Sequence, residues 1–162
     1  MTITLFFACT GNHIIAIEYF CPMHKIEHIG IAVSNLEESI SLYESLLSTD
    51  CYKQERVESE GVNTAFFKTG PNKIELIADD GEGVVSKFIS KRGEGIHHIA
   101  FAVDDIIAEM KRLKEAGFVL LNDEPKEGAD NKVICFLHPK NTKGVLIELC
   151  ADKAAHNSKI NK

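Results

Sequence analysis

The sequence predicts an α+β fold of two paired β-α-β-β-β modules, whose strands together form one sheet that lines a cavity. Two observations carry this prediction. A histidine-bearing stretch at 27–34 recurs within 95–104, each time with a polar residue, a histidine, five residues ending in valine and a helix-capping serine or aspartate. A helical pattern follows each stretch, and each copy closes on an Ile-Glu-Leu triplet, at 74–76 and at 147–149. The chain is therefore organised as an internal repeat.

The two faces of each histidine strand differ in character, because alternate residues of a strand point to opposite sides of its sheet. One face carries a histidine followed only by small residues: His28, Gly30 and Ala32 in the first copy, and His98, Ala100 and Ala102 in the second. The other face carries only branched or aromatic residues, which is typical of a core. The small residues leave room in front of the histidines, so the strands are predicted to line a cavity.

Each Ile-Glu-Leu triplet places a carboxylate, Glu75 or Glu148, within an apolar strand. Such a charge costs free energy unless it is solvated, paired or bound to a metal. A single strand histidine or glutamate is more often structural than functional, but matched positions in both halves favour a shared site. Together with His28 and His98, the two glutamates offer nitrogen and oxygen donors for a divalent metal.

Composition narrows the class of protein. A chain of 162 residues, 44% hydrophobic and 26% charged, suits one globular domain or two small fused modules. Its formal net charge of −6 argues against nucleic acid as a non-specific partner. The five cysteines are odd in number and lack C-x-x-C spacing, which favours a reducing compartment, the cytoplasm, over a disulfide framework. No apolar run is long enough to span a bilayer, so no membrane partner is expected.

The first 22 residues do not fit the repeat. They are apolar but contain no lysine or arginine, unlike a secretory signal or a transit peptide. We expect residues 1–22 to be an N-terminal extension outside the fold, and the domain to occupy residues 23–151.

The first module is expected at about 23–80. A strand at 26–33 leads into Ser34 and Glu37, which form the pattern of a capping box at a helix start. Apolar residues then recur at helical spacing as far as Leu47, so that face should pack on the sheet. Three further strands are expected between glycine-containing turns, at 51–58, 62–68 and 73–78.

The second module, at about 95–151, repeats this order after a connector with a short helix at 84–90. Its strand at 96–103 leads to Asp104 as the expected N-cap of a helix that ends at Gly117. Its remaining strands are expected at 118–122, 132–138 and 144–150. Residues 152–162 show no pattern and are expected to form a disordered tail.

Four stretches carry a resemblance to known proteins: the two histidine strands, the loop at 123–129 (DEPKEGA), and FLHPK at 136–140 running into GVLIEL at 144–149. Paired modules with a histidine on the first strand and a glutamate on the last resemble the vicinal oxygen chelate superfamily, also called the glyoxalase fold. Within it, these stretches resemble the methylmalonyl-CoA epimerases. The resemblance extends from Met23 to about Cys150, and the two late stretches are its more specific part.

The resemblance implies a site and a reaction. It implies four metal ligands, His28, Glu75, His98 and Glu148, for cobalt or another divalent ion such as zinc, nickel or manganese. The implied reaction interconverts the two epimers of methylmalonyl-CoA by 1,1-proton transfer through a metal-stabilised enolate. Glu148 matches one of the two groups that move the proton. The second group, a glutamate in some members, falls near Thr64, whose hydroxyl cannot do this at neutral pH.

The resemblance also implies partners. The substrate is a coenzyme A thioester, for which the late loops offer candidate cationic partners: Lys126, Lys140 and Lys143. Lysines in polar loops are, however, usually only solvated. The family further implies a homodimer.

Several alternatives remain open. A glyoxalase I-type lactoylglutathione lyase shares a His/Glu/His/Glu metal set, and a non-catalytic binding or resistance protein of this fold would show no turnover. An iron dioxygenase would use two histidines and one carboxylate, but Glu75 as a fourth ligand argues against it. Other polar residues receive structural interpretations: His97 as structural or supporting, His138 as part of a loop, and Cys135 and Cys150 as buried thiols.

Overall fold

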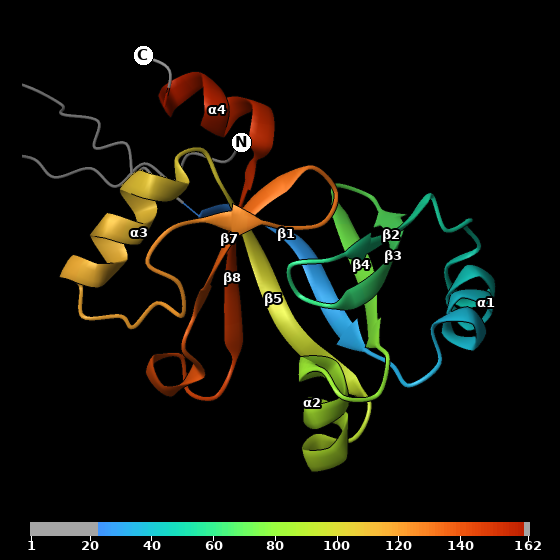
Figure 1. The fold of residues 1–162 in the computed structure, drawn as a ribbon. Helices are drawn as coiled ribbons and strands as arrows, with labels where there is room; N and C mark the ends of the chain where they lie inside the picture. The colour runs from blue at the N-terminus through green and yellow to red at the C-terminus, as the bar shows by residue number, and fades with distance from the viewer. Residues whose placement is uncertain (1–22, 161–162) are drawn as a thin grey trace, which may run out of the picture.

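Eight strands form one mixed sheet, in the order β2-β3-β4-β1-β5-β8-β7-β6, in the computed structural model, which describes residues 23–160 (Figure 1). The strands are β1 (Met23–Ala32), β2 (Lys53–Val57), β3 (Val62–Thr69), β4 (Asn72–Asp79), β5 (Gly95–Val103), β6 (Lys126–Glu127), β7 (Lys132–Leu137) and β8 (Leu146–Asp152). The helices are α1 (Leu36–Leu47), α2 (Val84–Arg92), α3 (Ile106–Glu115), the short 3-10 helix η1 (Pro139–Asn141) and α4 (Lys153–Ile160). The predictions for residues 1–22 and for the last two residues lie outside the described residues.

The two histidine strands lie side by side at the centre of the sheet (Figure 1). Strand β1 pairs antiparallel with β5, and each of them has the last strand of its own module on its other side, in parallel. The modules therefore join through their first strands, with the Ile-Glu-Leu strands β4 and β8 next to them. This confirms the predicted α+β fold of two β-α-β-β-β modules, and α2 confirms the expected connector helix.

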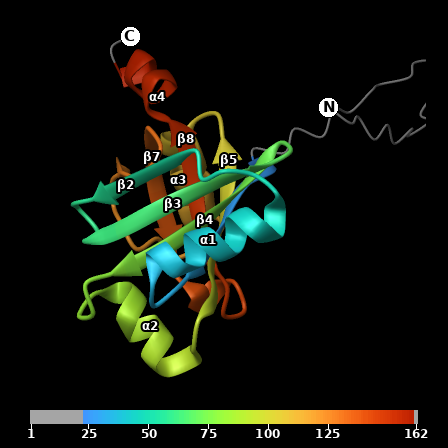
Figure 2. The same ribbon diagram turned by 90° about the vertical axis from the view of Figure 1, so that its right-hand side faces the viewer.

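The core lies between the sheet and the two long helices of the modules. Helix α1 covers β3 and β4 (Figure 2), where Ile40 packs with Ala65, Phe67 and Leu76. Helix α3 covers β7 and β8 in the same way, through Ile106, Met110, Leu113, Val133, Cys135 and Leu149. Since strand residues alternate between faces, the residues between these core positions point to the opposite side of the sheet, where only α2 packs, through Val85, against Ala32, Val62 and Ile77. That side holds the histidines and glutamates.

Both predicted N-caps were wrong by one residue. Helix α1 is capped by Asn35, whose Oδ1 accepts a hydrogen bond from the Glu38 N–H at 3.2 Å. Helix α3 is capped by Asp105, whose side chain accepts from the Ala108 N–H at 3.0 Å. The backbone N–H of Ser34 donates to the Glu94 carboxylate at 2.6 Å, so this residue is engaged with Glu94 rather than with the helix. Either of two adjacent polar residues could accept hydrogen bonds from the first N–H groups of a helix. The point at which the preceding strand ends determines which of them does so.

The strand expected at 118–122 was also wrong. The chain there follows β7 but forms one isolated bridge, between Leu120 and Leu137, and β6 takes the outer place in the sheet. Val119 and Leu121 are about half exposed, so extending the strand pairing at this edge would bury little apolar surface.

A helix replaces most of the expected disordered tail. Helix α4 starts where the Lys153 N–H donates to the Asn131 carbonyl at 3.0 Å and the Lys153 ammonium pairs with Glu127. Alanines at 154 and 155 favour a helix, but this segment lacks the apolar stripe by which sequence analysis recognises one.

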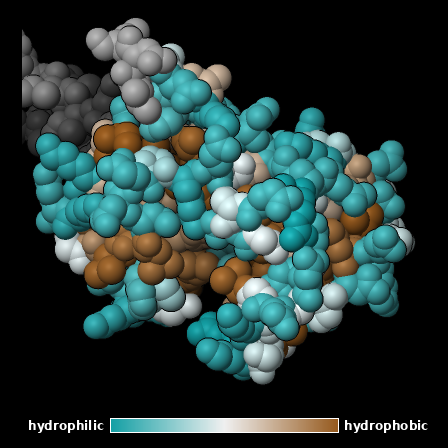
Figure 3. Space-filling model, in the orientation of Figure 1, coloured by the Kyte–Doolittle hydropathy of each residue, from teal (hydrophilic) through white to brown (hydrophobic). Residues whose placement is uncertain are grey.

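On the face shown in Figure 3, hydrophilic residues predominate and hydrophobic ones lie among them over the sheet. Among residues 23–160, no helix combines the length and apolar character that crossing a bilayer requires.

The caps give a test of the fold. Replacing Asn35 or Asp105 by alanine should lower the free energy of unfolding by about 1 kcal/mol each, because a helix N–H group loses its acceptor. Urea unfolding followed by circular dichroism measures this. Ser34→Ala is the matched control and should cost less, since no N–H of α1 depends on that side chain. A larger loss for Ser34→Ala would restore the capping box that the sequence suggested.

Candidate metal centre

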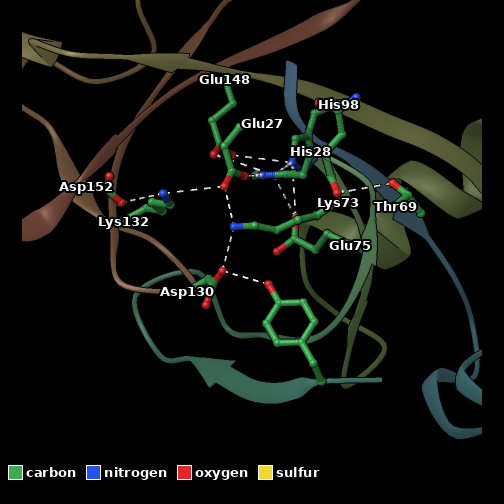
Figure 4. A network of polar contacts seen from close by, with 12 residues as sticks. Glu27, His28, Thr69, Lys73, Glu75, His98, Asp130, Lys132, Glu148 and Asp152 are labelled. Atoms are coloured by element: carbon green, nitrogen blue, oxygen red, sulfur yellow. Dashed lines mark hydrogen bonds and ion pairs between the residues drawn. The ribbon is translucent and has the colours of Figure 1, made fainter. Parts of the chain in front are cut away.

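Four buried side chains from four strands meet on the side of the sheet opposite α1 and α3 (Figure 4): His28 from β1, Glu75 from β4, His98 from β5 and Glu148 from β8. The two histidine Nε2 atoms are 2.9 Å apart, and a Glu75 oxygen lies 3.3 Å from each of them. The Glu148 oxygens lie 3.8 Å from His28 Nε2 and 3.5 Å from His98 Nε2. The structure thus brings together all four residues that the sequence predicted as ligands.

The pairing of β1 with β5 explains this convergence. Gly30 lies opposite His98, and His28 lies opposite Ala100, so each histidine faces a small residue on the neighbouring strand. A Cβ atom at Gly30 would overlap the His98 imidazole ring. The small residues that follow each histidine in the sequence therefore make room for the histidine of the other half. In the parallel pairs, Glu75 lies beside Gly30 and Glu148 beside Ala100, which completes the group.

A cavity surrounds the four side chains, with walls that are largely apolar. Phe66 stands edge-on to His28, with ring centroids 6.4 Å apart, and Phe136 stands edge-on to His98, at 5.7 Å. Thr64 also lines the cavity; it is buried, and its hydroxyl donates to the Glu55 carbonyl at 3.2 Å. Phenylalanine rings hold the imidazoles in place without competing for their nitrogens.

Charge in the cavity is strongly coupled. Burial alone would raise the pKa of Glu75, but hydrogen bonds and charge from His28 and His98 lower it to about 2. Burial raises the pKa of Glu148, and the charge of the two histidines only partly offsets this. Burial would lower the pKa of His28, but bonds to Glu27 and Glu75 and the charge of the carboxylates raise it to about 10. The carboxylates thus stabilise a positive charge at this point of the cavity, here on the protonated imidazole of His28.

The donor set fits a divalent cation. Ligand atoms that lie ~2.1 Å from one ion, at neighbouring positions around it, are separated by about 3.0–3.5 Å. The two histidine Nε2 atoms are 2.9 Å apart, and the glutamate oxygens lie 3.3–3.8 Å from them. Ligand atoms of His28, His98 and Glu148 all lie within 4.8 Å of one another. Two imidazoles and two carboxylates form a mixed nitrogen and oxygen set that suits borderline ions such as zinc, cobalt, nickel or manganese. These side chains could therefore hold one such ion between them.

Sequence analysis missed Glu27, Lys73 and Asp130. Glu27 is buried, and its carboxylate lies 2.6 Å from His28 Nδ1 and also binds the Lys73 ammonium, which in turn donates to Asp130 at 2.7 Å (Figure 4). Strict alternation would send Glu27 away from His28, but an irregularity in the β1–β5 register between Ile26 and His28 turns both toward the cavity. The one available signal was Lys73, two residues before Glu75 on the same face of β4.

The other polar residues that the sequence singled out, two histidines and two cysteines, make structural contacts. His97 lines the cavity, with its Nδ1 3.0 Å from His98 Nδ1, and burial lowers its pKa to about 4. His138 accepts from the Lys140 N–H at 3.0 Å and so shapes the η1 loop, as expected. Cys135 and Cys150 are buried free thiols, and burial raises the pKa of both.

Known proteins of similar sequence include a named epimerase and an uncharacterized protein. Residues 27–136 match the model of the Glyoxalase/Bleomycin resistance protein/Dioxygenase superfamily. The chain is 41% identical over 128 residues to ethylmalonyl-CoA/methylmalonyl-CoA epimerase of Cereibacter sphaeroides, covering 77% of this chain and 96% of that protein. It is 39% identical over 137 residues to the uncharacterized protein YqjC of Bacillus subtilis, covering 83% of this chain and 98% of YqjC.

A solved structure extends the similarity to the fold. A variant methylmalonyl-CoA epimerase from Streptomyces coelicolor, in complex with 2-nitronate-propionyl-CoA, superposes with a TM-score of 0.77 at 34% identity. The match covers 80% of this chain and 95% of the Streptomyces protein.

The close approach of Gly30 to His98 gives a test of the site. Gly30→Ala should lower the free energy of unfolding by about 1–3 kcal/mol, because the added methyl group forces the His98 ring or the strands to move. Urea unfolding measures the loss, and imidazole nitrogen NMR should show a displaced His98. Ala100→Gly is the matched control: it costs about 1 kcal/mol through backbone freedom and leaves the His98 signals in place. Unchanged His98 signals in Gly30→Ala would contradict the packing described here.

Proposed function

Because this chain belongs to the Glyoxalase/Bleomycin resistance protein/Dioxygenase superfamily, we propose that its cavity is the active site of an isomerase that interconverts the two epimers of methylmalonyl-CoA. One observation carries the proposal: His28, Glu75, His98 and Glu148 converge in an apolar cavity. Relatives of nearly the same extent as this domain, named as methylmalonyl-CoA epimerases, support the choice of substrate.

We propose that the four side chains hold one divalent ion, cobalt or another such as zinc, nickel or manganese. When bound, the ion supplies Lewis-acid chemistry toward the thioester and carboxylate oxygens of the substrate. His28, His98 and Glu75 hold one another at 2.9–3.3 Å and so form a fixed binding unit. The phenylalanines beside the histidines keep the surroundings apolar, which strengthens every charge interaction in the cavity.

Glu148 is the residue we propose to move the proton. The reaction breaks and re-forms a C–H bond at the carbon between the thioester and the carboxylate, so it needs a base with access to that carbon. Glu148 lies farther from the histidines than Glu75 does, and its raised pKa makes it the better proton acceptor of the two. Thr64 stands at the place of a second acid or base in some relatives. Its hydroxyl donates a hydrogen bond to a backbone carbonyl and cannot fill that role.

Partners follow from the substrate. We propose Lys140 and Lys143, which are exposed on the connection between β7 and β8, as partners of the coenzyme A phosphates. Lys126 is already engaged, since it pairs with Glu60 and lies 5.5 Å from the centre of the Phe136 ring. A homodimer and a cytoplasmic location remain part of this proposal, and the free buried thiols of Cys135 and Cys150 support a reducing compartment.

Proton exchange tests the proposed reaction. With a divalent ion and methylmalonyl-CoA in deuterated water, the protein should exchange the substrate α-proton, which proton NMR follows directly. Glu148→Gln should slow this exchange by about 10²–10⁴-fold, because an amide cannot accept the proton. Glu109→Gln is the matched control: Glu109 is also buried, but it binds Arg112 on α3, and exchange should continue.

The same experiment can reject the proposal. A folded, metal-loaded protein that exchanges no α-proton is not this epimerase. Methylglyoxal with glutathione is then the next substrate, because a glyoxalase I-type lyase would use the same four ligands. Turnover of neither substrate would leave a non-catalytic binding protein of this fold.

The two exposed lysines give a separate test. Replacing Lys140 and Lys143 together by alanine should raise KM for methylmalonyl-CoA by about threefold to tenfold with kcat unchanged, because a charge on phosphate acts equally on substrate and transition state. Steady-state kinetics measure both constants. Lys111→Ala, at an exposed lysine on α3, should change neither. An unchanged KM in the double variant would show that these lysines are merely solvated.

A further inference from the structure

The imidazole of His28 is held from behind by a buried carboxylate. Glu27 Oε2 lies 2.6 Å from His28 Nδ1, while His28 Nε2 faces His98, Glu75 and Glu148. Both Glu27 and His28 are at most 5% exposed, so water does not compete for this contact. With its proton on Nδ1, His28 donates a hydrogen bond to the Glu27 carboxylate. The lone pair of Nε2 then points toward the other three side chains of the metal centre. The contact therefore decides which nitrogen of His28 faces the cavity.

Glu27 itself is fixed by cations on its other side. Its second oxygen binds the Lys73 ammonium and lies 3.6 Å from Lys132 Nζ (Figure 4). Lys73 also donates to Asp130 at 2.7 Å, and Asp130 accepts from the Tyr52 hydroxyl at 2.9 Å. A network of this kind holds a buried carboxylate at one position with both oxygens in use.

We propose that Glu27 is a positioning residue for the metal centre: it orients His28 and, through its negative charge, makes His28 Nε2 a stronger ligand. This inference rests on the metal site of the proposed function. Carboxylates that accept the second N–H of a ligand histidine fix its ring and raise its basicity. At the equivalent place in the second half, His97 Nδ1 lies 3.0 Å from His98 Nδ1. Both histidines are thus held by the preceding residue, but His28 alone by an anion.

A rival arrangement would make Glu27 a ligand instead. Glu27, His28 and Cys150 are all buried, and each offers a ligand atom within 4.8 Å of the others. An ion there would have to take Glu27 Oε2 away from His28 Nδ1 or Oε1 away from Lys73. The cations around Glu27 also oppose a second positive charge. The geometry therefore favours a supporting carboxylate over a ligand.

Cobalt affinity of the full-length protein tests the inference without relying on activity. Glu27→Gln should weaken Co²⁺ binding by about 10–100-fold in calorimetry, because the amide cannot supply the charge. Glu27→Asp keeps the charge and should recover part of the affinity, which a loss of packing alone would not allow. Glu109→Gln, at a buried glutamate paired with Arg112, should leave the affinity unchanged. Thermal melting of each variant shows that it is folded.

The outcomes separate this inference from the proposed function. A wild-type protein that binds none of Co²⁺, Zn²⁺, Ni²⁺ or Mn²⁺ overturns the metal site and this inference with it. A wild-type protein that binds Co²⁺, with Glu27→Gln within twofold of it, overturns the inference alone. Loss of Co²⁺ binding in Cys150→Ala, together with a thiolate charge-transfer band in the wild-type spectrum, would place the ion at the rival group and overturn it as well.

Discussion

The antiparallel pairing of β1 with β5 is the constraint on which the rest of the structure depends. It sets Gly30 against His98 and Ala100 against His28, so each half of the repeat supplies the space that the other half's histidine fills. The parallel neighbours β4 and β8 then bring Glu75 and Glu148 to the same level of the sheet. A shift of one residue in this pairing would turn the histidines toward the core.

Buried negative charge is the cost of this arrangement, and the protein offsets it from two sides. Within the cavity, His28 carries a pKa of about 10 and His98 contacts both glutamates. Behind His28, the Glu27 carboxylate has a pKa of about 2: burial would raise it, but bonds to His28 and Lys73 outweigh that effect. A cation in the cavity would take over the role of the proton on His28.

The sequence predicted the features that follow from internal repetition and from the alternation of strand residues. It failed for features that depend on a single residue or a single hydrogen bond. The repeat identified both modules and all four converging side chains, because each copy supported the interpretation of the other. It placed both caps one residue early, since Ser34 and Asn35 are equally good acceptors until the end of the strand is known. It missed Glu27 because a register irregularity in β1 breaks the alternation that the prediction assumed. No sequence pattern marks such an irregularity.

The two halves of the site have the same framework but different chemistry. Phe66 pairs with Glu75 across β3 and β4, and Phe136 pairs with Glu148 across β7 and β8, so the wall beside each glutamate is equivalent. The glutamates nevertheless differ: Glu75 lies 3.3 Å from both histidines and has a lowered pKa, whereas Glu148 lies farther away and has a raised one. This divergence between the copies supports the proposed roles, in which Glu75 only binds the ion and Glu148 also accepts the proton, because carboxylates with different pKa values can take different parts in a proton transfer.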